Sequence, residues 1–127
     1  MIVAGIGCRR NAPADAIEES IGLALSKCGL ECTALGALAT AAEKGGEPGL
    51  REAASHLALP LLLIAEDELT RASEGALTVS ERVLTLKGVP SIAETAALAA
   101  AGRGARLIAA RVSNAHASCA IAIGEGQ

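Results

Sequence analysis

The sequence predicts an α/β fold: a three-layer α/β/α sandwich around a mixed, mostly parallel sheet of about five strands that ends in an antiparallel hairpin. Short strand-like runs alternate with amphipathic helical segments, which is the pattern of parallel βαβ units. The last part of the chain holds two strand-like runs joined by a short polar connection, which favours a hairpin. Residues 1–127 suit one hydrophobic core, so we expect a single domain.

The composition fits such a fold and argues against other classes. Hydrophobic residues make up 51% of the chain and charged residues 20%, which excludes an intrinsically disordered protein. Phe, Tyr and Trp are absent and the net charge is −3, so we expect no nucleic-acid partner. We also expect a cytoplasmic protein without a membrane partner. No targeting segment is visible, and the longest apolar run, 57–65, contains Pro60.

The first strand–helix unit has clear boundaries. An apolar strand from Ile2 runs into a glycine turn at Gly7. A helical stripe of apolar residues then extends from about Ala14 to Cys28, and Gly29 follows as a helix stop.

The second unit is weaker. Residues 34–40 predict a strand rich in Ala and Gly, which are poor strand formers. A polar loop over 41–47 leads to a helix whose first turn tolerates Pro48. The continuously apolar run 61–65 predicts a strand covered on both faces, and the acidic residues 66–68 are typical of a helix first turn.

The remaining elements follow a segment that is hard to assign. Within residues 73–85 we expect a short helix over 80–84. Ser91 suits an N-cap, and Glu94 completes a capping box for an almost wholly Ala and Leu helix over 92–101. So apolar a helix is either buried or packed on a partner chain. The terminal hairpin is expected over 106–112 and 118–123.

Three loops follow the carboxyl ends of the predicted parallel strands, where open α/β sheets bind their ligands. The first carries Gly7, Cys8, Arg9 and Arg10, the second runs from Thr40 through Lys44 to Gly49, and the third leads from Glu66 towards Ser91. Basic side chains and free helix-end amides bind carboxylates and phosphates, so this edge predicts an anion site. The alternative is that the glycines only form turns, the arginines are solvated and residues 44–46 are a plain flexible loop.

Complete catalytic and cofactor motifs are missing. Position 10 is Arg where the dinucleotide fingerprint needs its third glycine, and there is neither a P-loop nor a nucleophile elbow. Cys8, beside two arginines, is a candidate for a lowered pKa. Glu66 is the best carboxylate candidate, with a helix first-turn acid as the alternative. We expect His56 to be structural and His116 to be solvated, and we expect no catalytic residue and no cofactor.

The cysteines predict no metal site. Cys28 and Cys32 form a lone C-x3-C pair without a second pair or a histidine at ligand spacing. We expect Cys28, Cys32 and Cys119 to be reduced, buried thiols.

Three motifs occur in a definite order: G-I-G-C-R-R at 5–10, T-x3-K-x2-E-P-G-L at 40–50 and G-V-P-S-I-A-E-T-A-A-L at 88–98. Together they resemble the cobalamin-biosynthesis family of free-standing CobE proteins and CbiG C-terminal domains, over nearly the whole chain. Residues 41–43 depart from the usual pattern, which is richer in Asp and branched residues. The family's motif residues fall on Gly7, Cys8, Arg9, Arg10, Thr40, Lys44, Glu47, Pro48, Gly49 and Ser91.

The resemblance implies a role in building the corrin ring, with a precorrin-type tetrapyrrole as the ligand. The carboxylate arms of such a ligand suit the basic edge, so we expect a non-catalytic binder. The alternatives are a CbiG-like hydrolase that opens a precorrin lactone ring, and an interaction module whose Ala-rich helix docks onto another corrin-pathway enzyme. A homo-oligomer is also compatible with that helix. The expected ligand-binding residues are Gly7, Cys8, Arg9, Arg10, Thr40, Lys44, Glu47, Gly49, Glu66 and Ser91.

Overall fold

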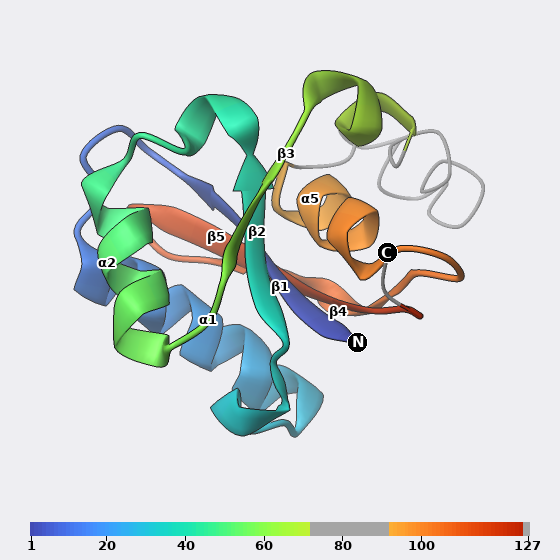
Figure 1. The fold of residues 1–127 in the computed structure, drawn as a ribbon. Coiled ribbons are helices and arrows are strands. Elements are labelled where there is room, and N and C mark those ends of the chain that lie inside the picture. Colours follow the sequence, from blue (N-terminus) through green and yellow to red (C-terminus); the bar gives the residue numbers. More distant parts are fainter. Residues whose placement is uncertain (72–91, 126–127) are drawn as a thin grey trace.

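The computed structural model describes residues 1–71 and 92–125, and Figure 1 shows their arrangement. Strands and helices alternate through the first half, and a hairpin ends the chain. The elements are β1 (Ile2–Cys8), α1 (Ala14–Cys28), β2 (Ala37–Ala41), α2 (Pro48–Leu57), β3 (Leu61–Ile64), α5 (Ile92–Ala101), β4 (Arg106–Ser113) and β5 (Ala117–Ile123).

The five described strands form one mixed sheet in the order β3-β2-β1-β5-β4. Strands β1, β2 and β3 are parallel neighbours, and β5 runs antiparallel to both β1 and β4. The predicted sheet with a terminal hairpin is therefore confirmed. Because the first three strands are parallel, their carboxyl ends, at Cys8, Ala41 and Ile64, lie at one edge.

Helices cover both faces of the sheet, as the three-layer prediction requires (Figure 1). Alternate residues of β1 point to opposite faces, so Ala4 packs with α1 and α2 while Val3 packs with α5. The α1 face has the larger side chains, among them the fully buried Ile6 and Ile17. The α5 face is built mostly from alanine.

Helix α1 follows its sequence pattern closely. Its buried stripe contains Ile17, Ile21 and Leu25. Gly29 ends the helix in the left-handed region at φ 69°, where glycine has no Cβ penalty. The amide of Asn114, in the β4–β5 turn, donates 2.8 Å to the carbonyl oxygen of Ala16 and so ties the hairpin to the first half of the helix.

Helix α5 is buried against the sheet, which confirms the first of the two expectations for this Ala-rich segment. Ala93, Ala97 and Ala101 are fully buried. A Cβ added at Gly5 of β1 would overlap the carbonyl oxygen of Ala93, so glycine is what allows this close approach. Within residues 1–71 and 92–125, no helix has the length and apolar character of a membrane span.

Several local predictions were wrong. Strand β2 begins at Ala37 rather than at 34, because residues Cys32–Ala34 form a short 3₁₀ turn. The chain does not turn at Gly7, since β1 continues through it to Cys8. Strand β3 is not covered on both faces: it lies at the end of the described sheet, and Leu63 is 47% exposed. Cys28 and Cys32 are only half-buried.

The short helix expected over 80–84 and the N-cap expected at Ser91 lie outside the described residues. The acidic segment after β3 does begin a helix, which is described over 66–71.

Candidate functional site

The first two predicted loops meet at the carboxyl edge of the sheet. Thr40, fully buried in β2, donates its hydroxyl 2.8 Å to the carbonyl oxygen of Ile6 in β1 and so joins the two strand ends. The charges of Lys44 and Glu47 both act on the Cys8 thiol, which shows that the second loop reaches the end of β1. Thr40 thus has a structural partner, and Lys44 and Glu47 are near enough to the end of β1 for their charges to act on Cys8.

Two further contacts lock these loops together. The backbone N–H of Asn11 donates 2.8 Å to Oε1 of Glu47, the residue just before α2. Gly49 lies directly against Ala12, because a Cβ added at Gly49 would overlap the carbonyl oxygen of Ala12. This close backbone approach requires a glycine at position 49 of the second motif.

Arg9 and Arg10 are both exposed. The backbone N–H of Arg9 donates 2.9 Å to the carbonyl oxygen of His116, so the hairpin turn supports the loop from the other side. Over the described ranges neither arginine forms an ion pair with the protein. Their charges are therefore available to a ligand, although the same exposure is what solvated arginines would show.

Cys8 is half-buried between these loops. Burial raises the pKa of its thiol; the Lys44 ammonium acts in the lowering direction and the Glu47 carboxylate in the raising direction. Cys8, which the sequence made a candidate for a lowered pKa, therefore has a raised pKa instead. A thiol held in the neutral form is not an activated nucleophile.

The third part of the edge is the start of α5. A Cβ added at Gly7 would lie 3.7 Å from the nitrogen of Ala93 and 3.9 Å from Cβ of Ile92, so the helix begins beside the end of β1. Ser91, expected as a ligand-binding N-cap, is outside the described part of the chain. Glu66 is exposed at the start of the 66–71 helix. This position agrees with the alternative expectation, that Glu66 is an acidic residue in the first turn of a helix.

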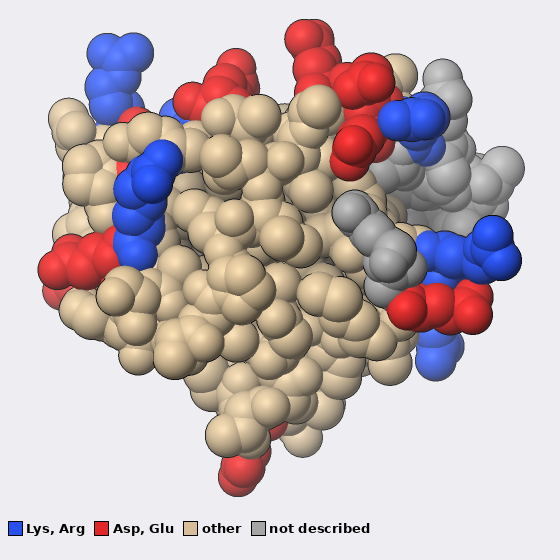
Figure 2. Space-filling model, in the orientation of Figure 1, with Lys and Arg blue, Asp and Glu red and all other residues tan. Residues whose placement is uncertain are grey.

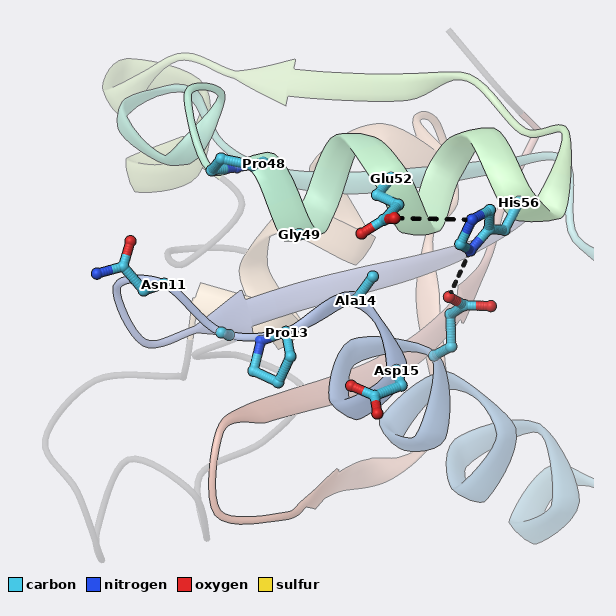
Figure 3. Close-up of a pocket in the computed structure, with 10 residues that line it drawn as sticks. Asn11, Pro13, Ala14, Asp15, Pro48, Gly49, Glu52 and His56 are labelled. Atoms are coloured by element: carbon cyan, nitrogen blue, oxygen red, sulfur yellow. Dashed lines mark hydrogen bonds and ion pairs between the residues drawn. The ribbon is translucent and has the colours of Figure 1, made fainter.

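A groove between α1 and α2 was not predicted from the sequence. It has a volume of about 530 Å³ and runs from the end marked by Asn11 and Pro48 to His56 (Figure 3). Nδ1 of His56 lies 3.0 Å from Oε2 of Glu18, and Nε2 lies 3.9 Å from Oε1 of Glu52. The hydrogen bond with Glu18 raises the pKa of His56 above its usual 6.5.

The charges of this groove do not suit a polyanion. Three carboxylates line it, from Asp15, Glu18 and Glu52, with His56 as the one basic side chain among its lining residues. The expectation that His56 is structural agrees with its bridge between the two helices. His116 is exposed in the hairpin turn, as expected.

The cysteines offer no alternative centre. All four are free thiols, and burial strongly raises the pKa of Cys119. In the portion that the structure describes, no three His, Cys, Asp or Glu side chains are grouped as metal ligands.

Comparison with known proteins identifies the family. The sequence profile described as "Cobalamin synthesis G C-terminus" matches residues 2–122, nearly the whole chain. The chain belongs to this CbiG C-terminal family. The resemblance drawn from the three motifs is thereby confirmed, and a role in cobalamin biosynthesis follows from it.

Individual relatives agree with this assignment. Protein CobE of Sinorhizobium sp is 33% identical over 121 residues, which cover 95% of this chain and 79% of that protein. The crystal structure of cobalamin biosynthesis protein chiG from Agrobacterium tumefaciens superposes with a TM-score of 0.82 at 42% identity, over 98% of this chain and 99% of the other. A crystal structure of CobE, a protein from the cobalamin (vitamin B12) biosynthetic pathway, superposes with a TM-score of 0.81 at 36% identity, over 96% of this chain and 92% of the other.

The three motifs of this CbiG C-terminal domain converge around the end of β1. The first motif supplies the strand end and the arginine loop, and the second contacts that loop through Glu47 and Gly49. The described part of the third motif is the start of α5, which packs on Gly5 and lies beside Gly7. Motifs far apart in the sequence thus surround one edge of the sheet.

Proposed function

We propose that this protein binds a precorrin-type tetrapyrrole at the carboxyl edge of its parallel strands, without catalysing its conversion. The observation that carries the proposal is the pair of exposed arginines, Arg9 and Arg10, in the loop where the family motifs converge; Lys44 adds a charge that acts on the neighbouring Cys8. Corrin intermediates carry several acetate and propionate arms, and arginine and lysine bind such carboxylates through charge-assisted hydrogen bonds. The family's place in cobalamin biosynthesis supports this class of ligand.

The same edge has apolar side chains that suit the macrocycle. Leu63 and Ile92 are 47% and 42% exposed and belong to the large apolar residues that stay accessible within 1–71 and 92–125. Leu63 contacts Gly45 in the second loop, and Ile92 starts α5 beside Gly7. In the view of Figure 2, Asp and Glu as well as Lys and Arg lie along the upper rim, the side on which β2 and β3 end in Figure 1, while uncharged atoms fill the centre. Basic groups next to apolar ones are what an amphipathic macrocycle needs.

The chemistry of the edge favours binding over hydrolysis. Opening a lactone needs an activated water or nucleophile. In the described part of this edge the Cys8 thiol is a candidate nucleophile, and burial raises its pKa, which favours the neutral form. A corrin-pathway enzyme as a further partner is compatible with a binding role, since a protein that holds an intermediate must pass it on.

The experiment is a titration of the purified chain with a stable corrin carboxylic acid, followed by analysis of the ligand for products. The protein has no Phe, Tyr or Trp, so the pigment dominates the absorption spectrum and its shift reports binding directly. We expect saturable binding and an unchanged ligand. Absence of binding up to about 100 µM would contradict the proposal. Release of a two-carbon fragment from a lactone precorrin would show a hydrolase instead.

A further inference from the structure

The loop that carries Arg9 and Arg10 ends in an unusual backbone conformation. Asn11 has φ 62°, in the left-handed region, which L side chains rarely adopt. Asn is among the residues that tolerate this region best, but it is still disfavoured there compared with glycine. Such a conformation persists only where neighbouring contacts hold it, and it occurs often at ligand sites.

Glu47 provides the side-chain contact that holds this residue. Its Oε1 accepts the backbone N–H of Asn11 at 2.8 Å, across 36 positions of sequence. Within the described chain, residues 9–12 form two hydrogen bonds with residues outside this loop. One is the bond to Glu47, and the second is a backbone bond from the N–H of Arg9 to the carbonyl oxygen of His116. The turn that follows the arginines is therefore fixed from the second loop by one carboxylate.

Glu47 makes this contact from the N-cap position of a helix, where its residue type is unusual. Glu47 is the N-cap residue of α2, where Ser, Thr, Asp or Asn would normally cap the helix, yet its side chain makes no capping bond. Glu47 is a poor residue for a helix N-cap, yet it forms a specific contact with a residue far away in the sequence. This combination indicates that Glu47 is selected for the contact. A carboxylate beside a site for a polyanion would also repel the ligand, so a direct contact with ligand carboxylates is unfavourable.

We propose that Glu47 is a positioning residue of the corrin site, which holds Asn11 in the left-handed turn and thereby sets the direction of Arg9 and Arg10. The proposal rests on the proposed function for its ligand. It replaces the expectation that Glu47 itself binds the ligand. The carboxylate acts as a hydrogen-bond acceptor, and its charge is a cost to binding.

The test compares Glu47→Gln with Glu47→Ala in the corrin titration. Both variants remove the same negative charge, and Gln retains a side-chain oxygen that can accept the Asn11 N–H. We expect Glu47→Gln to bind at least as tightly as the unmodified protein and Glu47→Ala to bind roughly three- to tenfold more weakly, as the loss of one hydrogen bond predicts. Glu43→Ala, an exposed carboxylate in the same loop, is the matched control and should not weaken binding.

A second variant tests the mechanism. In Glu47→Ala/Asn11→Gly, glycine adopts the left-handed turn without help, so most of the lost affinity should return. Equal weakening by Glu47→Gln and Glu47→Ala would overturn the proposal, because it would show that the charge or a direct ligand contact matters. Affinity of Glu47→Ala equal to that of the unmodified protein would overturn it as well.

Hydrogen exchange of the Asn11 amide, followed by NMR without ligand, separates this proposal from the proposed function. Protection should persist in Glu47→Gln and fall in Glu47→Ala. If the protein binds no corrin acid, the function fails, while this exchange pattern still shows whether Glu47 holds the loop. Unchanged protection in Glu47→Ala would refute the positioning role even if the corrin acid binds.

Discussion

Nδ1 of His56 in α2 lies 3.0 Å from Oε2 of Glu18 in α1, and this pair joins the two helices on one face of the sheet (Figure 3). His56 is 54% exposed and Glu18 29% exposed. The contact is therefore partly screened by solvent and contributes modestly to stability. Its interest lies in its dependence on pH.

The pair should stabilise the fold at acidic rather than alkaline pH. The pKa of His56 is raised in the folded protein, first by the hydrogen bond with Glu18, so its stabilisation is complete below the unfolded value of about 6.5. This stabilisation is lost as the pH rises through the pKa that His56 has in the folded protein. Thermal unfolding at pH 5.5 and 8.5 should show His56→Gln more destabilised, relative to the unmodified protein, at pH 5.5.

Glu18→Gln is the partner variant, and the double variant should lose little more than either single one at pH 5.5, because both remove the same pair. The account of this pair is contradicted if His56→Gln shifts the unfolding temperature equally at both pH values.

Gly5→Ala should destabilise the protein strongly. The added Cβ would overlap the carbonyl oxygen of Ala93 and lie 2.6 Å from the nitrogen of Ala97, and these are backbone atoms that cannot rotate away. We expect a loss of about 3 kcal/mol in the free energy of unfolding, at the upper end of the overpacking range. Urea denaturation measures this loss.

Gly22→Ala is the matched control for this substitution. Gly22 lies within α1, and an added Cβ there meets no atom within 4 Å. Because alanine is the better helix former, this variant should gain about 1 kcal/mol. Similar effects of the two substitutions would show that α5 does not pack on β1 as described.

The Cys8 thiol should react slowly with iodoacetamide at neutral pH, because burial raises its pKa and keeps it protonated. Lys44→Gln removes a charge that lowers this pKa, so alkylation should become slower still. Glu47→Gln removes a charge that raises it, so alkylation should become faster. Mass spectrometry of the peptide containing Cys8 gives the rates. Faster alkylation in Lys44→Gln would contradict this arrangement of charges.

The sequence correctly predicts those helices and strands that are determined by residues close to one another in the chain. The apolar stripe of α1 and its stop at Gly29 appear as expected, and so does the terminal hairpin, because periodicity and turn residues act within a few positions. The family was also recognisable, since its three motifs are read directly from the chain. The prediction that strand β3 is covered on both faces is wrong because an apolar run does not reveal where a strand lies in the sheet, and Leu63 is accessible.

The details of the site depend on tertiary contacts that no local pattern contains. The Cys8 pKa is set first by burial, which outweighs any neighbouring positive charge. The bond between Asn11 and Glu47 joins residues 36 positions apart. The sequence does hold one signal: Asn11, after two arginines and two residues before Pro13, suits a left-handed turn, but its partner is not deducible.

We propose that Arg9 and Arg10 bind the carboxylates of a corrin ligand. The decisive measurement compares the dissociation constants of Arg9→Ala/Arg10→Ala and a control, Arg103→Ala/Arg106→Ala, for one corrin carboxylic acid. The control also removes two exposed arginines. Arg106 is paired in the sheet with Ile123, and Ile123 is paired with Ile2, the first residue of β1. Arg106 therefore lies at the edge of the sheet opposite the carboxyl end of β1. Equal unfolding temperatures would show that both variants fold.

We predict that Arg9→Ala/Arg10→Ala weakens binding by about tenfold or more for each arginine in contact, while the control stays within about twofold of the unmodified protein. Full affinity in a folded Arg9→Ala/Arg10→Ala variant, or equal weakening in both variants, would contradict a corrin site at the carboxyl ends of the strands.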